Sequence, residues 1–176
     1  MKKIIILLTS LLLAATDLNA QVWSIGVFPD NVTATLSNGT LTISGTGKMR
    51  NWRVDAPDGA DPIVYNNSEV RRIIIEDGVT HIGNYAFSTC KNLTSVSIGK
   101  GVKSIGQSAF IICEALPSII IPENVTSIGA QAFLGCTNLA VVFFEGNMPT
   151  FGSDVFNNEN GEPDLTLCYT PEATGW

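Results

Sequence analysis

The sequence predicts a β-rich repeat solenoid of four 23-residue coils with short helical turns, preceded by an N-terminal β-hairpin cap. Three observations carry this prediction. The heptapeptide SIGQSAF of residues 104–110 recurs as SIGAQAF at 127–133 and as HIGNYAF at 81–87. A short segment of alternating polar and apolar residues follows each copy at a constant distance. Before the repeats, residues 32–43 alternate in the same way on both sides of an Asn-Gly pair.

The first segment, residues 1–20, has the layout of a secretory signal peptide. Lys2 and Lys3 form a basic start, an apolar run follows over residues 4–15, and Ala20 ends a polar segment with a small residue suited to cleavage. The twelve-residue run is shorter than the roughly 20 residues that a membrane span needs. The sequence therefore predicts a secreted or cell-surface protein, cleaved after Ala20, with no membrane span after signal removal.

Charge and composition narrow the class of partner. The chain has 176 residues, 45% of them hydrophobic and 15% charged, which is typical of one globular domain. Removing residues 1–20 leaves 8 basic and 15 acidic residues, a net charge of −7. Binding to a phosphate backbone needs clustered Lys and Arg, which the sequence lacks. Nucleic acid is therefore not an expected partner.

Residues 21–69 lack the 23-residue period and are predicted to cap the solenoid. Alternation around Asn38-Gly39 is a strong signal for a two-residue hairpin. Because a solenoid exposes the apolar face of its first coil, the hairpin is expected to cover that end. The apolar residues expected to do so are Val32, Ala34, Leu36, Leu41 and Ile43 on one face of the hairpin, with Trp23, Met49 and Trp52.

Residues 70–168 are predicted to form the four coils. A shift of 23 residues aligns apolar columns without an insertion, and a unit this short can bury its apolar face only against copies of itself. In each coil the alternating segment is expected to form a strand. The Gly is expected to allow a close approach between coils. The stretch from QSAF to GC is expected to form a helical or 3₁₀ turn. Columns include Phe87, Phe110, Phe133 and Phe156; Cys90, Cys113 and Cys136; Ile73, Val96, Ile119, Val142 and Leu165; and Ile75, Ile98, Ile121, Phe144 and Leu167.

The pattern V.SIG..AF..C..L..I.I, present as VKSIGQSAFIICEALPSIII at residues 102–121, resembles the BspA-like class of bacterial leucine-rich repeats. The resemblance covers residues 69 to about 168, and residues 169–176 look like the start of a C-terminal cap. It implies a right-handed leucine-rich-repeat solenoid in a secreted or surface protein. Some members of that class are implicated in adhesion to host matrix proteins, and most have no assigned activity.

Candidate catalytic groups are few. His81 is the only His, and in the other coils its position is held by Ser104, Ser127 and Thr150. No motif sets a nucleophile or an acid beside it. We therefore expect no catalytic residue and no enzymatic activity.

The cysteines allow three interpretations. Cys90, Cys113 and Cys136 form a ladder that a secreted protein could oxidise, but three in a row leave one unpaired. Buried thiols acting as small apolar groups are favoured over a disulfide or a zinc site, because no second ligand type repeats with them. Cys168 lies outside the ladder and is expected to be an exposed single thiol.

Two acidic loops could offer carboxylates to calcium. They contain Asp55, Asp58 and Asp61 in one case and residues 157–164 in the other, but neither has the spacing of a calcium-binding loop. Solvated connections are the favoured interpretation. The sequence predicts no metal site and no cofactor.

The outward positions of the predicted strands remain as a candidate binding surface, which we call the outer strand surface. Apolar residues occur there although alternation calls for polar ones, and exposed apolar groups often mark contact surfaces. These residues favour a non-enzymatic module that binds an extracellular protein or glycan, and a host matrix protein is one candidate partner. The alternative is a structural spacer without a dedicated ligand. The residues of the outer strand surface are Arg72, Ile74, Ser95, Ser97, Ser118, Ile120, Val141 and Phe143.

Overall fold

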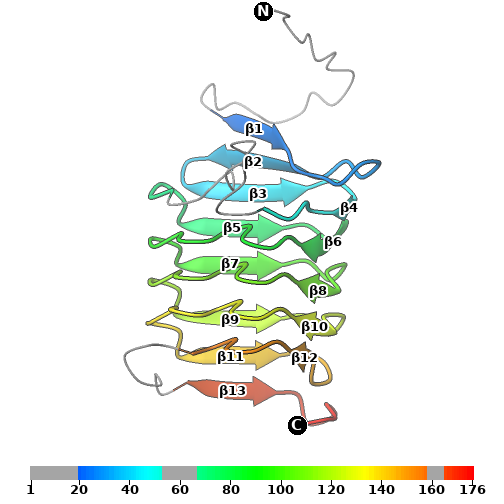
Figure 1. The fold of residues 1–176 in the computed structure, drawn as a ribbon, viewed down its shortest axis with the longest axis vertical. Coiled ribbons are helices and arrows are strands. Elements are labelled where there is room, and N and C mark those ends of the chain that lie inside the picture. Colours follow the sequence, from blue (N-terminus) through cyan, green and yellow to red (C-terminus); the bar gives the residue numbers. More distant parts are fainter. Residues whose placement is uncertain (1–19, 53–66, 158–164) are drawn as a thin grey trace, which may run out of the picture.

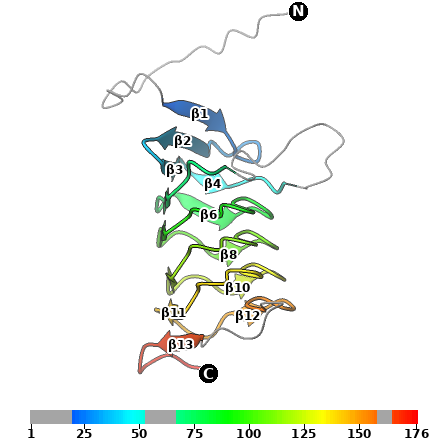
Figure 2. The same ribbon diagram turned by 90° about the vertical axis from the view of Figure 1, so that its left-hand side faces the viewer.

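A computed structural model describes residues 20–52, 67–157 and 165–176, and in these ranges the protein is a stack of short strands on two sides (Figure 1). The side view shows the coils following one another at regular intervals (Figure 2). The first side holds β1 (Gln21–Ser24), β2 (Thr33–Ser37), β3 (Thr40–Ser44), β5 (Arg72–Ile75), β7 (Ser95–Ile98), β9 (Ser118–Ile121), β11 (Val141–Phe144) and β13 (Thr166–Tyr169). The second side holds β4 (Gly47–Lys48), β6 (Val79–Ile82), β8 (Ser104–Ile105), β10 (Ser127–Ile128) and β12 (Thr150–Phe151).

The register of the strands follows the period in the sequence. On the first side Ile73 pairs with Val96, and on the second side Ser104 pairs with Ser127, in both cases one 23-residue coil further along. These pairings are parallel, as stacked coils require. The predicted solenoid of 23-residue coils is confirmed.

A file of aromatic rings runs through the core. Ring centroids are 5.1 Å apart for Phe87 and Phe110, 5.3 Å for Phe110 and Phe133, and 5.6 Å for Phe133 and Phe156. The first three side chains are at most 1% exposed. Each coil therefore supplies one ring to a shared spine, as the sequence predicts.

The predicted helical turns are wrong. The described residues contain no helix, and Tyr85, Ser108, Gln131 and Asp154 all have φ between 52° and 59°. The stretch that leads from each second-side strand to the next first-side strand forms a third side of the coil. Along it, alternate N–H groups donate to the next coil instead of to the preceding turn. Phe110 N, for example, donates to Ala132 O at 2.8 Å. A helix would need those donors internally, so stacking wins over local helix formation.

The Gly that precedes each Phe of the spine by four residues lies where two coils approach closely. A Cβ on Gly106 would lie 2.6 Å from Asn84 N, and one on Gly129 would lie 2.5 Å from Gln107 N. Both distances are well inside van der Waals contact. Any side chain at these positions would push neighbouring coils apart.

The predicted hairpin is present, and it also extends the solenoid. β2 and β3 pair antiparallel across Asn38 and Gly39, whose φ values of 48° and 73° match a two-residue turn. β3 then pairs parallel with β5, with Leu41 beside Ile73. The hairpin is therefore a further rung of the first side, and the side chain of Trp52 is buried at 3% exposure next to it.

The last coil departs from the predicted columns. Phe144 pairs with Tyr169 and Val142 with Leu167, an offset of 25 residues rather than 23. The expected alignment of Phe144 with Leu167, and of Val142 with Leu165, is therefore wrong. Two extra residues in the final connection shift every side chain of β13 along its strand.

The first side is interrupted between β7 and β9, which lie next to one another in the stack but share no ladder. β7 ends one five-stranded sheet, and β9 begins a three-stranded sheet with β11 and β13 (Figure 1). Thr94 N donates to Arg71 O at 2.8 Å, and Ala140 N donates to Pro117 O at 2.9 Å. Pro117 occupies the position in its coil that Thr94 and Ala140 hold in theirs, and it has no N–H to donate.

Pro122 removes a second bond at the other end of β9. Glu145 N donates to Ile121 O at 3.0 Å, and Pro122 holds the equivalent position one coil earlier. It cannot donate to Ile98 O. Val96 and Ile98 are half-buried, whereas the corresponding residues of β5, β9 and β11 are buried. We call this interruption the β7/β9 seam.

Three segments singled out in the sequence lie wholly or mostly outside these ranges. The predicted signal peptide, except for Ala20, is outside the described residues. So are the carboxylates of Asp55, Asp58 and Asp61, and residues 158–164 of the second acidic loop. Within the part of the chain that is described, no helix is long and apolar enough to cross a membrane.

Candidate binding surfaces

The outer strand surface is assembled in two rows across β5, β7, β9 and β11. One row pairs Arg72 with Ser95 and, beyond the β7/β9 seam, Ser118 with Val141; the other pairs Ile74 with Ser97, and Ile120 with Phe143. Ile120 is 54% exposed and Val141 37% exposed. Ile74 and Phe143 are half-buried, and the remaining four are exposed.

The hairpin adds residues to this surface that the sequence analysis missed. Thr40 lies beside Arg72, and Thr42 lies beside Ile74 and, on its other side, Thr35. Val22 follows in the same row and is 64% exposed. Alternation in residues 32–43 indicated which side chains share a face, but not which strand of the coils the hairpin joins. The surface is therefore hydroxyl-rich on β2 and β3 and apolar towards β11, with the exposed Val22 at its β1 edge.

Cys168 also belongs to this surface. It pairs with Phe143 and is half-buried, so the expectation of an exposed thiol needs correction, whereas its place outside the ladder of the other three cysteines is as predicted. The shifted register of β13 brings it into the row.

The other three cysteines are buried, and none forms a disulfide. Cys113 Sγ donates to Phe87 O at 3.3 Å, and Cys136 Sγ donates to Phe110 O at 3.1 Å. Burial raises the pKa of Cys90 to about 12 and the pKa of Cys113 well above its ordinary value. These thiols behave as small core groups, the favoured interpretation. Among the described residues, no three His, Cys, Asp or Glu side chains are grouped closely enough to hold a metal ion.

His81 has partners that the sequence did not indicate. Its Nδ1 lies 2.7 Å from Ser104 Oγ, and its Nε2 lies 3.3 Å from Asn51 Oδ1. Ser104, His81 and Asn51 thus lie in the order of a nucleophile, a base and an orienting group. The charges around His81, however, disfavour its action as a base. Burial and the Lys48 ammonium lower the pKa of His81. The imidazolium that a general base must become is therefore disfavoured here, and the contact is a rung-to-rung pair between β6 and β8.

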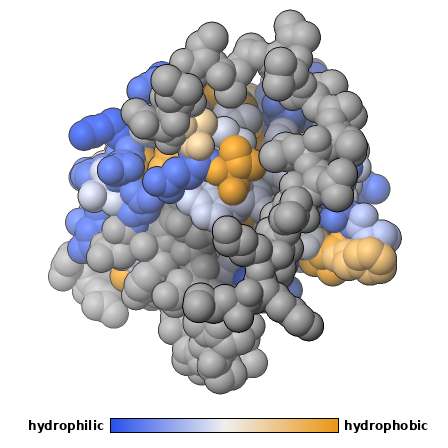
Figure 3. All heavy atoms as spheres, turned by 90° about the horizontal axis from the view of Figure 1, so that it is seen from above, coloured by the Kyte–Doolittle hydropathy of each residue, from blue (hydrophilic) through white to orange (hydrophobic). Residues whose placement is uncertain are grey.

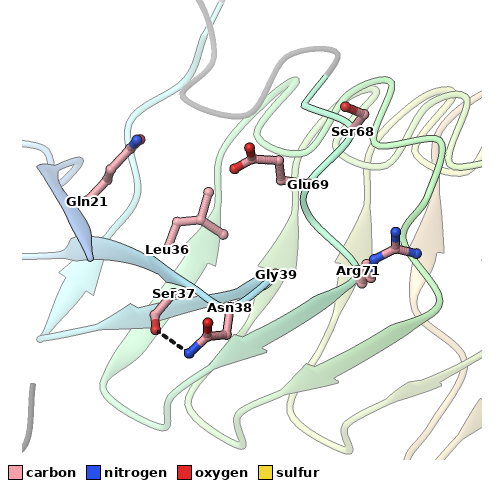
Figure 4. Close-up of a pocket in the computed structure, with 8 residues that line it drawn as sticks. All are labelled: Gln21, Leu36, Ser37, Asn38, Gly39, Ser68, Glu69 and Arg71. Atoms are coloured by element: carbon pink, nitrogen blue, oxygen red, sulfur yellow. Dashed lines mark hydrogen bonds between the residues drawn. The ribbon is translucent and has the colours of Figure 1, made fainter. Parts of the chain in front are cut away.

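A depression of about 440 Å³ lies at the hairpin turn (Figure 4). Glu69 and Arg71 both line it, so its charges offset each other. Asn38 Nδ2 donates to Ser37 Oγ at 3.4 Å beside it. Nothing in this lining selects a ligand of one charge.

The repeats match a known family. The match is to the BspA type leucine rich repeat region, in six copies over residues 61–168, which is more than half of the chain. None of the curated proteins matches the chain.

Solved structures share the fold. A leucine-rich repeat protein from Eubacterium ventriosum aligns with a TM-score of 0.60 at 20% identity, covering 86% of this chain and 44% of its own. A leucine rich cell surface protein from Faecalibacterium prausnitzii aligns with a TM-score of 0.53 at 21% identity, covering 81% of this chain and 39% of its own. A leucine-rich repeat protein from T. pallidum aligns with a TM-score of 0.52 at 17% identity, covering 83% and 61%.

The chain thus spans less than half the length of the first two of these proteins. At these identities the likeness concerns the fold alone. The repeat pattern, the Phe spine and the match over residues 61–168 lead to one conclusion: the chain belongs to the BspA-type leucine-rich repeat family.

Proposed function

We propose that the protein is a secreted or cell-surface, non-enzymatic module that binds an extracellular protein or glycan through its outer strand surface. One observation carries the proposal: Ile120 is 54% exposed on a strand position where water-facing residues are ordinarily polar. Val141 and Phe143 extend the same apolar area on β11. Such contiguous apolar exposure is typical of contact surfaces.

Two observations support the proposed secreted or cell-surface location of the protein. The layout of residues 1–20 predicts a signal peptide, and the Faecalibacterium prausnitzii protein of the same fold is described as a cell surface protein. The non-enzymatic part rests on His81, whose lowered pKa and neighbouring Lys48 disfavour its use as a general base.

The size of the surface limits the kind of partner. Eight strands about 4.8 Å apart and roughly 15 Å long give an area of roughly 500 Å². A standard protein interface covers about 800 Å² on each partner. We therefore expect weak binding to a protein by one chain, and tighter binding when several copies act together.

The test is a double variant, Ile120→Ser with Val141→Ser, applied to an array of matrix proteins and glycans. We expect retention to fall while the melting temperature stays within the few degrees typical of surface changes. The matched control is Ile112→Ser, because Ile112 is also apolar and 36% exposed but lies on the third side of the coil.

Equal loss of retention in the double variant and the control would contradict the proposal. Full retention by the double variant would also contradict it, and would favour the alternative, a structural spacer without a dedicated ligand.

A further inference from the structure

A second surface lies on the other side of the molecule, around the only His of the chain. It is an open depression of about 590 Å³, which we call the His81 groove. Most of its lining residues lie on β4, β6 and β8 or close before or after them. Figure 1 shows these three strands stacked on the second side. The groove is lined by Val27, Lys48, Met49, Asn51, Thr80, His81, Lys103 and Ser104.

Every polar side chain of the His81 groove can donate a hydrogen bond, and the two charged side chains among them are positive. The lining contains two ammonium groups, an imidazole, two hydroxyls and an amide, and it contains no carboxylate. The chain as a whole has a net charge of −6, so this groove is opposite in sign to the chain's net charge. Field lines focus in clefts lined by one sign of charge, which concentrates ligands of the opposite sign there.

The ammonium groups of Lys48 and Lys103 are exposed, and neither is paired with a carboxylate of a described residue. The Asp30 carboxylate lies close by, since its Oδ2 accepts a bond of 2.7 Å from the backbone N of Lys48, but it forms no ion pair with either ammonium group. Lys48 also contributes to the lowered pKa of His81, which agrees with a positive potential in the groove. An anion could therefore enter without first displacing an internal carboxylate.

An exposed aromatic residue is next in the chain to one of the residues that line the groove. Val27 lines the groove, and Phe28, the next residue, is 96% exposed. The connection that carries them is anchored by backbone bonds, because Val27 N donates to Lys48 O at 3.1 Å and Arg50 N donates to Ile25 O at 2.8 Å. Figure 3 shows apolar atoms exposed at the right-hand margin of this end, the side to which the β1–β2 connection projects in Figure 1.

We propose that the His81 groove binds an acidic oligosaccharide, with Lys48 and Lys103 holding its anionic groups and Phe28 packing against a sugar ring. Hydroxyl and amide groups of the lining suit the many hydroxyls of a sugar chain. An acidic peptide is a poorer fit, because peptides are recognised through pockets for apolar side chains, through a free strand edge or, for acidic motifs, through clusters of Arg, and the lining holds no Arg. Here the apolar lining is limited to Val27 and Met49, and Met49 is only 1% exposed.

The test uses the full chain and two acidic probes, oligogalacturonate and oligomers of dextran sulfate. Because His81 is the only His, its imidazole signals in an NMR titration report on the groove without ambiguity. We expect those signals to shift on addition of at least one acidic probe. Lys48→Gln and Lys103→Gln should each weaken its binding about tenfold, and Phe28→Ser about threefold or more. Carboxylated and sulfated sugars are distinguished by which probe binds tighter.

Lys100→Gln is the matched control, because it removes the same charge from a residue outside the lining of the groove. It should leave binding within about twofold of the unmodified protein. Neutral cello-oligosaccharide should leave the His81 signals in place. Three outcomes would overturn the proposal: unshifted His81 signals with both acidic probes, tighter binding of an oligoglutamate peptide, or a loss with Lys100→Gln as large as with Lys48→Gln. The double variant of the outer strand surface should bind the acidic probe normally, which separates the two sites.

Discussion

The rings of Phe110 and Phe133 are stacked in the core, with their planes 2° apart and their centroids 5.3 Å apart. Both side chains are fully buried. Since each ring comes from a different coil, this contact joins neighbouring repeats that could not bury their apolar faces alone.

Replacing one ring should therefore destabilise the whole stack. We expect Phe110→Ala to lower the free energy of unfolding by about 3–5 kcal/mol, the usual cost of removing a buried Phe. Chemical denaturation followed by Trp fluorescence measures the change. Phe28→Ser, at a position 96% exposed, is the control and should change stability by no more than about 0.5 kcal/mol. A similar effect of the two substitutions would mean that the spine does not support the fold.

The β7/β9 seam should be a weak point of the first side. Because Pro117 and Pro122 cannot donate to β7, we expect amide hydrogens of β7 and β9 to exchange faster than those of β11. Pro122→Glu introduces the residue found at the equivalent positions 76 and 145 and restores a donor towards Ile98 O.

We expect that variant to slow exchange in β7 and β9. Its overall stability should change by less than about 1 kcal/mol, since the gained bond is offset by the greater freedom of the unfolded chain. Pro171→Glu, at an exposed position outside the seam, is the control. Exchange in β7 as slow as in β11 in the unmodified protein would show that the seam is closed.

Alkaline pH should destabilise the protein through the buried thiols of Cys90 and Cys113, whose pKa values are raised. The pKa of Cys90 is raised to about 12 in the folded state, above the ordinary thiol value in the unfolded chain. The folded state therefore holds this proton more tightly, and stability is lost as the pH rises from about 9 towards 12. The slope should be about 1.4 kcal/mol per pH unit for each such thiol. Cys90→Ala should reduce the slope measured by denaturation across this range; an unchanged slope would mean that the thiol does not titrate in this way.

Ser108 is a position where the sequence is not optimal for the fold. Its φ is 52°, its side chain is fully buried, and its Oγ has no hydrogen-bond partner among the described residues. Ser108→Ala removes the unpaired hydroxyl and should raise the free energy of unfolding by about 1 kcal/mol. Tyr85→Ala, at the equivalent left-handed position one coil earlier, lacks this gain and serves as the comparison. A lower melting temperature for Ser108→Ala would show that the hydroxyl is satisfied in solution.

The sequence by itself determined the coil and its core. The spacing of Phe87, Phe110 and Phe133 predicts a file of rings, and the Gly that precedes each by four residues predicts close contact between coils. These features could be predicted because identical units stacked at a fixed interval must place equivalent residues on top of one another. The signal for the seam was also present, since Pro117 and Pro122 stand where other coils have donors, but its meaning depends on the observed bonds.

The contacts between segments that are not one repeat length apart were decided only by the tertiary structure. The pairing of Leu41 with Ile73, the shift of Tyr169 to Phe144, and the contact of His81 with Asn51 join segments whose separation in the chain is not a repeat length. The left-handed backbone at Ser108 was hidden for a related reason: its local sequence suits a helical turn, and the bond to Ala130 in the next coil overrides that preference. A periodic pattern specifies how copies stack. Where a connection of unrelated length brings the chain back, the register is set by which apolar faces can be buried together.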